Sequence, residues 1–441
     1  MNIPKSDLPR IVIVGAGFAG LMLTRKLLKA SYQIVLIDKN NYHQFQPLFY
    51  QVAMAGLEPS TISFPLRRLL RSNPNVFIRI AEVLRVDFNA NTITTDIGEL
   101  EYDYLVLANG AKTNFFGKKN IEQIALTLKS LSEALLVRNT ILDHYESALL
   151  EADNVKRQGY VDIVIIGGGP AGVELAGSLA EMKKYILPKD YNELNPKEVD
   201  IYLIEANSNV LASMSMKSSA AAERYLQKMG VLVMKNNRVS DVDADFVYLQ
   251  DGSKIMSKNV IWTAGLTGAL LDGIPSEVIT KGNRILVNAF NRIDAYKNIF
   301  VLGDLAFTAD DPAYPNGHPQ VAQVALQQAK NLADNLKNTV KDVNYKWKPF
   351  KYRDLGTLAT IGRNKAVADF PSFSFYGFFA WLIWLFVHLF QLLGVRNKIF
   401  VFINWVANYI SYDQALRFII RPKKDFRNEM DQFNSTKPPV K

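Results

Sequence analysis

The segment "RIVIVGAGFAGLMLTRKLLKA", residues 10–30, decides the fold, because it reads as a strand, a glycine turn and a helix in succession. Its turn holds the pattern Gly15-x-Gly17-x-x-Gly20, and a second apolar strand, "YQIVLID", follows and ends at Asp38. In such a βαβ unit the glycines allow a tight turn, close approach of a pyrophosphate, and close helix–strand packing. A carboxylate at the end of the second strand can hydrogen-bond a ribose hydroxyl. The segment therefore predicts a dinucleotide site, although one such motif also fits an ordinary glycine turn.

The same order of elements returns in "YVDIVIIGGGPAGVELAGSLAEM", which contains Gly167-x-Gly169-x-x-Gly172. Glu205 ends the next apolar run, and the long interval before it predicts a helical insertion around residues 181–198. Two complete motifs, each followed by an acidic strand end, are far more specific than one. Two dinucleotides bound in one chain indicate a flavin and a nicotinamide, and the paired units favour FAD over FMN.

Two acidic residues refine these sites. Glu205 is followed by Ala206 and Asn207, with no basic residue to match a 2′-phosphate, so the second site favours NADH over NADPH. "VLGDLA" (301–306) places Asp304 after a glycine at another strand end. Asp304 is interpreted as a second flavin contact, and an N-cap for a following turn is the alternative.

The composition narrows the chemistry further. The chain has 441 residues, 49% apolar content, a net charge of +9 and no cysteine. A disulfide framework, a cysteine-ligated metal and redox chemistry through a protein dithiol are therefore excluded, and the four histidines show no metal-ligand spacing. The N-terminus has no secretory pattern, so no cleaved signal is expected. The positive charge indicates an anionic partner, and because no nucleic-acid module is recognisable, we expect acidic lipid.

The most apolar stretch is "GFFAWLIWLFVHLFQLLG", residues 377–394. As a helix it would measure roughly 27 Å, against a hydrocarbon core of about 30 Å, so spanning is only just possible. Basic residues flank it on both sides, which disfavours a span under the positive-inside rule. An in-plane pair of helices joined near Gly394 is favoured instead, with a buried core or homodimer interface as the alternative.

The faces of these two helices support an interfacial position. One face of the first helix carries Trp381, Trp384, His388 and Gln391, with tryptophan suited to the headgroup zone, and the other carries Phe379, Leu382, Phe386, Leu389 and Leu393. In the second helix, a polar stripe is formed by Asn404, Asn408 and Ser411. The basic residues expected to meet anionic headgroups are Arg353, Arg363, Lys365, Arg396, Lys398, Arg417, Arg421, Lys423, Lys424 and Arg427.

The predicted fold class is α/β, with two Rossmann-like dinucleotide-binding domains and a C-terminal amphipathic helical membrane-docking region. A helix is expected over 319–338, and short strands over 345–369. The predicted domains are an FAD-binding domain in two parts (1–117 and 283–338), an NADH-binding domain (118–282) and the membrane-docking region (339–441).

Together these motifs resemble the type II NADH dehydrogenases, the single-chain, non-proton-pumping NADH:quinone oxidoreductases among the two-dinucleotide-binding-domain flavoproteins. The resemblance runs along nearly the whole chain. Its specific parts are "GAGFAG", "FQPLFYQVA" (45–53), "TNFFG" (113–117), "GGGPAGVELAG" (167–177), "WTAGL" (262–266), "VLGDLA", "AQVALQQA" (322–329), "GTLATIGRNKAVAD" and "NWVANYISYDQALRFIIR" (404–421). It implies hydride transfer from NADH to FAD, then two electrons to a membrane quinone, ubiquinone or menaquinone, in the respiratory chain.

The resemblance also implies the binding residues, and it implies no metal. The expected FAD contacts are Gly15, Ala16, Gly17, Phe18, Ala19, Gly20, Asp38, Lys39, Pro47, Val83, Ala108, Gly110, Ala111, Gly303 and Asp304. The expected NADH contacts are Gly167, Gly169, Pro170, Gly172, Glu205, Ala264 and Gly265. Asn109 departs from the usual family pattern, which puts its own contact in doubt.

Three residues are expected to be catalytic. Glu174 matches the glutamate that the family places close to the nicotinamide and flavin, and its expected role is proton handling. The alternative is a carboxylate that only stabilises a helix N-terminus, because Glu174 is expected in the first turn of the second nucleotide-binding helix. Gln323 and Gln327 lie one helical turn apart and match the glutamine pair beside the quinone, where a neutral amide can donate to a carbonyl. Two solvent-facing glutamines are the alternative, and Tyr50 is a more speculative member.

Two other functions remain open. A soluble NADH-dependent flavoprotein reductase for a protein electron carrier would not need the apolar C-terminal region. A flavin-based redox sensor would be reduced by NADH without fast quinone turnover. Because NADH is cytoplasmic, the expected location is the cytoplasmic face of the cell (inner) membrane, as a peripheral or monotopic protein.

Overall fold

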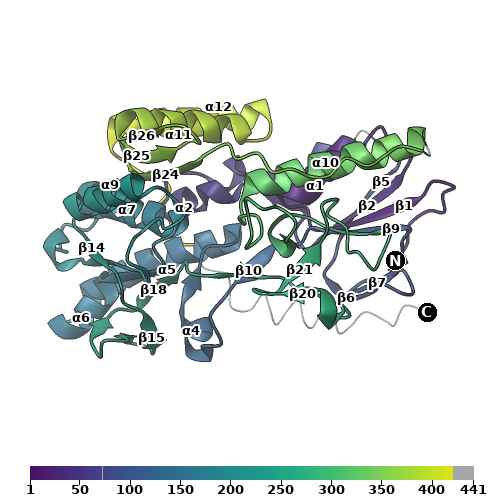
Figure 1. Cartoon of the computed structure of the whole chain (residues 1–441). Coiled ribbons are helices and arrows are strands. Elements are labelled where there is room, and N and C mark those ends of the chain that lie inside the picture. The colour runs from purple at the N-terminus through teal and green to yellow at the C-terminus, as the bar shows by residue number, and fades with distance from the viewer. Residues whose placement is uncertain (72, 343, 421–441) are drawn as a thin grey trace, which may run out of the picture.

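Two sheet-based units stand side by side in the computed structural model, which describes residues 1–71, 73–342 and 344–420 (Figure 1). The first sheet has the order β22-β9-β1-β2-β5, and all its pairs are parallel. Its strands are β1 (Arg10–Val14), β2 (Gln33–Asp38), β5 (Val76–Ile80), β9 (Tyr104–Leu107) and β22 (Ile299–Val301). Helix α1 (Phe18–Leu27) connects β1 to β2, so the first predicted βαβ unit is confirmed.

The second sheet repeats this arrangement with the order β11-β18-β12-β13-β14. Its strands are β11 (Leu126–Thr127), β12 (Ile163–Ile166), β13 (Ile201–Ile204), β14 (Val231–Met234) and β18 (Asn259–Trp262). Every residue of β12 is buried, as expected for a parallel strand covered by helices on both faces. Helix α7 (Pro170–Tyr185) joins β12 to β13, and α9 (Met216–Lys228) leads to β14. The predicted α/β class with two Rossmann-like sheets is confirmed.

Each unit also carries a three-stranded antiparallel meander, which lies between β5 and β9 in the first unit and between β14 and β18 in the second. The meanders are β6 (Val83–Asp87), β7 (Thr92–Thr95) and β8 (Gly98–Glu101) in the first unit, and β15 (Val239–Val242), β16 (Phe246–Leu249) and β17 (Lys254–Met256) in the second. The chain leaves the first unit on β10 (Ala111–Thr113) and returns on β19 (Leu266–Gly268), which pair antiparallel. Strand β22 then completes the first sheet by pairing parallel with β9.

The remaining elements cover and connect the sheets. They are β3 (Tyr42–Gln44), α2 (Phe49–Ala53), β4 (Ser63–Pro65), α3 (Leu66–Leu70), α4 (Lys119–Ile124), α5 (Leu131–Leu150), α6 (Asn154–Val161), β20 (Ile279–Thr280), β21 (Arg284–Val287), β23 (Ala306–Thr308) and α10 (Ala322–Lys341). The helix expected over 319–338 is α10, which lies beside α1 (Figure 1). The expected insertion around 181–198 is the end of α7, the short α8 (Leu187–Asp190) and a 3-10 turn.

The C-terminal region consists of a small sheet and two helices. The sheet is β24 (Thr357–Gly362), β25 (Lys365–Asp369) and β26 (Ser374–Tyr376), and the helices are α11 (Phe378–Gln391) and α12 (Val395–Ser411). Helix α7 lies directly on β24, because a Cβ at Gly177 would come within 1.8 Å of the Ile361 carbonyl oxygen. Helix α11 has 14 residues, about 21 Å. Leaving out 72, 343 and 421–441, the chain has no helix with the length and apolarity needed to cross a bilayer.

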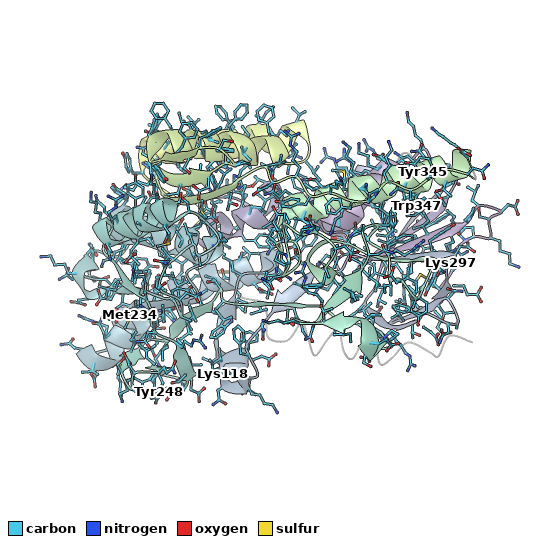
Figure 2. The ribbon with its side chains drawn as sticks, in the orientation of Figure 1. Lys118, Met234, Tyr248, Lys297, Tyr345 and Trp347 are labelled. Atoms are coloured by element: carbon cyan, nitrogen blue, oxygen red, sulfur yellow. The ribbon has the colours of Figure 1, made fainter. Side chains whose placement is uncertain are left out.

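The orientation of α11 corrects the predicted role of its faces. Trp384 is 1% exposed and points into the protein, so it is not available to a headgroup zone. The phenylalanines are the exposed side chains, and Phe379, Phe386 and Phe390 are all more than 60% exposed. Figure 2 shows aromatic rings projecting outward from α11 and α12. The tryptophan face turned inward because it reaches a buried hydrogen-bond acceptor, which sequence periodicity does not reveal.

Helix α12 has its polar side toward the protein and an apolar side toward the surroundings. The side-chain amide of Asn408 donates to the Gly56 carbonyl at 2.9 Å. Ile403 and Ile410, in contrast, are exposed. Together, α11 and α12 form an apolar platform, defined here as residues 378–411. Two basic residues assigned to lipid are engaged elsewhere: Arg417 pairs with Asp190 and Asp413, and Arg363 donates to carbonyls at the end of α12. The predicted contacts of Arg421, Lys423, Lys424 and Arg427 lie outside the described residues.

Candidate active site

The first glycine turn is built as the sequence predicts. Gly15 has a φ of +97°, and a Cβ at Gly20 would lie 1.9 Å from the Gly15 carbonyl oxygen, so neither position tolerates a side chain. A Cβ at Gly17, just before α1, would meet nothing within 4 Å. The Asp38 carboxylate accepts hydrogen bonds from the Ala16 and Asn40 backbone N–H groups at 2.6 and 2.7 Å. Open space therefore faces the helix N-terminus, beside an acidic strand end.

The second turn repeats the geometry of the first. Gly167 has a φ of +111°, and a Cβ at Gly172 would lie 2.0 Å from the Gly167 carbonyl oxygen. Gly169 faces open space, and α7 begins at Pro170. The Glu205 carboxylate accepts hydrogen bonds from the Gly168 N–H at 2.6 Å and from the backbone N–H of Asn207 at 2.8 Å. Both turns therefore present the features of a dinucleotide site.

A neighbouring strand end lies against each turn. The Ala108 carbonyl would be 2.5 Å from a Cβ at Gly15, and the backbone nitrogen of Ala264 would be 2.8 Å from one at Gly167. The predicted residues Gly110, Ala111 and Gly265 follow these strand ends, where the connections β10 and β19 pair. The unusual Asn109 donates its side-chain amide to the Ala269 carbonyl at 2.5 Å. Asn109 thus ties the outgoing connection to the returning one.

Asp304 lies in a buried site with two cations nearby. Burial raises the pKa of its carboxyl, while the charges of Lys129 and Arg284 oppose that rise. The preceding residue, Gly303, has a φ of +69° and donates its N–H to the Gln328 side-chain oxygen at 2.7 Å. Sequence reasoning found Asp304 and Gly303 but missed Lys129 and Gln328, because neither belongs to a glycine motif. The remaining FAD-contact candidates occupy the first unit: Phe18 and Ala19 on α1, Lys39 after β2, Pro47 before α2, and Val83 at the start of β6.

The glutamine pair on α10 has a structural partner. Gln323 donates to the Gly356 carbonyl at 3.1 Å and accepts from the Leu355 N–H at 3.0 Å. Gln327 makes the same pair of hydrogen bonds with the backbone of Arg353, at 2.9 and 3.1 Å. The two amides therefore hold the segment 353–356, which leads into β24. Each amide nitrogen carries two hydrogens, so one donor of each remains for another partner.

Glu174 is a buried carboxyl of the second nucleotide helix. It is the fifth residue of α7, and the first turn contains no acidic residue, so its predicted first-turn position is wrong and the helix N-terminal interpretation loses support. One carboxylate oxygen accepts from the Trp384 indole N–H at 3.3 Å and the Thr360 N–H at 3.4 Å. Burial raises the pKa of Glu174 to about 8, although these two donors oppose the rise. Burial therefore favours the neutral form of this carboxyl.

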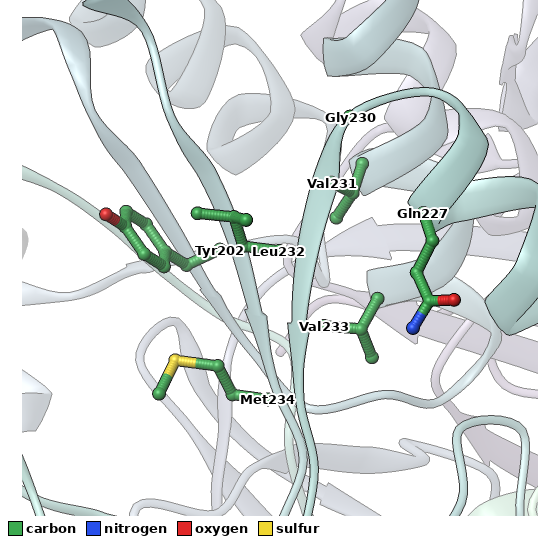
Figure 3. A pocket seen from close by; sticks show the side chains of 7 residues that line it. All are labelled: Tyr202, Gln227, Gly230, Val231, Leu232, Val233 and Met234. Atoms are coloured by element: carbon green, nitrogen blue, oxygen red, sulfur yellow. The ribbon is translucent and has the colours of Figure 1, made fainter.

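An apolar cavity of about 580 Å³ separates the platform from α2, α7 and β24. Its walls include Tyr50, Thr360 and Trp384, and the last two also contact Glu174. The rest of the lining comes mainly from aromatic and aliphatic side chains of α11 and α12, and it includes Glu181 of α7. Sequence reasoning predicted Glu174 and suspected Tyr50, but it missed Thr360 and misplaced Trp384. A second hollow of about 520 Å³ follows the edge strand β14, lined by Tyr202, Gln227 and 230–234 (Figure 3), and shares no lining residue with this cavity.

Comparison with known proteins identifies the lineage of this architecture. Residues 9–329 match the family described as pyridine nucleotide-disulphide oxidoreductase, and residues 355–411 match the NDH2 C-terminal domain. The chain is 34% identical to the type II NADH:quinone oxidoreductase NdhA of Mycobacterium tuberculosis, covering 91% of this chain and 87% of that protein. It is 33% identical to Ndh of the same organism, covering 96% and 93%.

A solved structure agrees in fold. The structure of NDH2 from Plasmodium falciparum in complex with NADH superimposes with a TM-score of 0.86 at 21% identity, covering 94% of this chain and 100% of that one. The C-terminal match covers the small sheet and the platform, which lie outside the match to the larger family. The resemblance inferred from the motifs is confirmed: the chain belongs to the type II NADH:quinone oxidoreductase family, within the pyridine nucleotide-disulphide oxidoreductases.

Proposed function

We propose that the chain is a non-proton-pumping NADH:quinone oxidoreductase that holds FAD on its first unit and NADH on its second, and reduces a membrane quinone. The observation that carries the proposal is the convergence at Glu174. Helix α7 starts from the second glycine turn and carries Glu174. The buried carboxylate of Glu174 accepts a hydrogen bond from Trp384 of the apolar platform. A nucleotide site and a lipid-compatible surface therefore meet at one proton-exchanging group.

The two turns fit the proposed cofactors. Open space at Gly17 and Gly169 leaves room for a pyrophosphate before each helix, where backbone N–H groups and the helix dipole favour negative charge. The carboxylates of Asp38 and Glu205 stand at the two strand ends where a ribose hydroxyl would be held. Glu205 would also repel a 2′-phosphate, which supports NADH over NADPH. Bound FAD would supply the acceptor for the hydride of NADH and the donor of two electrons to the quinone.

Glu174 is proposed to handle protons rather than hydride. Reduction of a quinone by two electrons also consumes two protons, so a carboxyl that exchanges protons near neutral pH suits the reaction. Tyr50 lies beside it, and burial followed by the Glu174 charge raises its pKa well above the ordinary value. Tyr50 therefore keeps its proton, and its hydroxyl is proposed to orient the substrate.

The apolar cavity is the proposed quinone path. Its aromatic walls suit a planar ring with a prenyl tail, and the platform above it provides a route from lipid. Gln323 and Gln327 are not among the residues that line this cavity. They are proposed to act on the quinone ring beyond it, through the donor that each amide leaves unused, while their other hydrogen bonds hold segment 353–356.

The platform is proposed to rest in-plane on the cytoplasmic face of the membrane. Exposed phenylalanines on α11 point away from the protein, and Arg396 on α12 is exposed at the same surface. Co-sedimentation with vesicles of phosphatidylglycerol and phosphatidylcholine tests this role. Phe386→Glu should abolish most of the binding, whereas Leu150→Glu, at an 88% exposed site on α5, should leave it intact. Equal binding by both variants would contradict docking through the platform.

The enzymatic proposal is tested on protein purified from membranes. The absorption spectrum and extracted cofactor identify the flavin, and NADH and NADPH oxidation are then compared with ubiquinone and menaquinone analogues. Fast quinone-dependent NADH oxidation is expected, and Glu174→Gln should slow turnover with the flavin still bound. Reduction of the flavin without quinone turnover would instead indicate a redox sensor. Activity only with a protein electron carrier would indicate the soluble type of reductase.

A further inference from the structure

We infer that Trp384 is a positioning residue for Glu174, and that its indole N–H, carried on the platform helix α11, fixes the carboxyl group and favours its ionised form. The donor and acceptor are 3.3 Å apart in a fully buried contact. They lie 210 positions apart in the chain, and they meet because α11 packs on the small sheet whose strand β24 packs on α7. The inference deepens the proposed function, and rests on it only where turnover is the measurement.

The indole ring is held in place by its surroundings. His388, one helical turn later, stacks on Trp384 with ring centroids 4.0 Å apart and planes inclined by 23°. Its Nδ1 lies 2.8 Å from the Trp384 carbonyl oxygen, which fixes the imidazole in turn. Trp405 and Tyr50 pack on the indole with centroids 5.9 and 6.3 Å away. A ring enclosed in this way presents its N–H in one direction only, toward Glu174.

A second indole of the platform reaches the same neighbourhood. Trp405 on α12 donates to the Gln51 side-chain oxygen at 2.7 Å, and the Gln51 amide donates to the Tyr50 hydroxyl oxygen at 2.8 Å. The charge of Glu174 acts in turn on Tyr50. Each platform helix therefore supplies one indole donor, α11 to the buried Glu174 and α12 to the half-buried Gln51. This second link supports a positioning role for the platform, and Trp384 is its direct contact.

Removal of the indole N–H should make the carboxylate harder to form. A hydrogen bond to an ionised carboxylate is stronger than one to the neutral carboxyl, so its loss favours the protonated form. In Trp384→Phe the midpoint of the pH profile of turnover should therefore move upward by about one unit. In the Glu174→Gln background the same substitution should leave the pH profile unchanged, because the indole N–H then has no carboxylate to stabilise. Glu181, the other carboxyl of α7, accepts its hydrogen bond from the Arg363 backbone N–H instead, so loss of the indole does not act on it.

Trp347→Phe is the matched control. The Trp347→Phe substitution also removes one indole hydrogen bond, which Trp347 donates to the Thr339 hydroxyl oxygen at 2.8 Å. The Trp347 ring stacks on Phe300 of the first sheet, and Figure 2 shows Trp347 beside α10. Its pH midpoint should equal that of the unmodified enzyme. An unmoved midpoint in Trp384→Phe, or an equal movement in Trp347→Phe, overturns the inference.

A measurement independent of catalysis covers the case in which Trp384→Phe does not fold. The chain has five tryptophans, so fluorotryptophan incorporation gives a short ¹⁹F NMR spectrum of the intact holoenzyme. The chemical shift of at least one resonance should change with pH, with a midpoint near the raised Glu174 pKa of about 8. This pH dependence should be absent in Glu174→Gln. Absence of any such resonance would refute the contact. Failure of quinone turnover alone would refute the proposed function and leave the spectrum as the test of Trp384.

Discussion

Replacement of Glu174 by glutamine should stabilise the folded protein in a strongly pH-dependent way. The carboxyl is buried and its pKa is raised from 4.5 to about 8. Between these two values the folded state holds a proton that the unfolded state has already released, so stability falls as pH rises through this window. A difference of about 3.5 units at about 1.4 kcal/mol per unit sets an upper bound of about 5 kcal/mol.

The test compares urea unfolding of the holoenzyme and of Glu174→Gln from about pH 5 to pH 9, followed by circular dichroism. At pH 5 the two proteins should differ by less than about 1 kcal/mol, because the carboxyl is neutral in the folded state and pH 5 lies only slightly above its unfolded pKa of 4.5. As the pH rises further, the free energy of unfolding of the variant should increasingly exceed that of the unmodified enzyme, and the difference should persist above pH 8. Glu193→Gln, at an exposed site, is the control and should show no such divergence. A stability difference that stays constant with pH would falsify the buried-carboxyl reasoning.

Three further outcomes follow from close contacts and hydrogen bonds. Gly177→Ala should lower the free energy of unfolding by about 1–3 kcal/mol, measured by denaturant unfolding, because the new Cβ would collide with the Ile361 carbonyl and push α7 away from β24. Unchanged stability would mean that the two elements separate freely. Gly20→Ala should lower the flavin-to-protein ratio after purification, because its Cβ would collide with the Gly15 carbonyl; full flavin content would contradict the assignment of that turn to FAD. Asp369→Asn should lower the melting temperature at neutral pH, and the difference should shrink as pH falls through the pKa of Asp369. Burial raises that pKa, but hydrogen bonds from three serines outweigh it, so the ionised form is the stabilising one.

The sequence was a good guide wherever structure depends on local rules. Gly15 and Gly167 both adopt positive φ, and Gly20 and Gly172 both lie where no Cβ fits, as the spacing of each motif predicted. The acidic strand ends were equally predictable, because a strand end beside a glycine turn has few possible neighbours. These features depend on a few consecutive residues and on the geometry of one βαβ unit.

The part of the site that depends on distant contacts could not be predicted in the same way. Periodicity separated the two faces of α11 but could not say which one turned inward, because the deciding acceptor, Glu174, belongs to another unit. The glutamine pair was placed correctly on one helix face, yet its hydrogen bonds to the backbone of 353–356 depend on the path of a loop. Lys129 carried no signal, since its proximity to Asp304 arises only when the two units assemble.

The opposed faces of α11 bear on how a water-soluble form of this enzyme can be obtained. The phenylalanines that would make the protein aggregate and the tryptophan that contacts Glu174 belong to the same 14-residue helix. Truncation before residue 377 would remove the exposed apolar side chains of the platform. It would also open the buried Glu174 carboxyl to water and uncover the apolar residues of β25. Exchange of Phe379 and Phe390, which are exposed and do not line the cavity, for polar residues leaves the inner face untouched. Solubility and activity are therefore separable by substitution, but not by deletion.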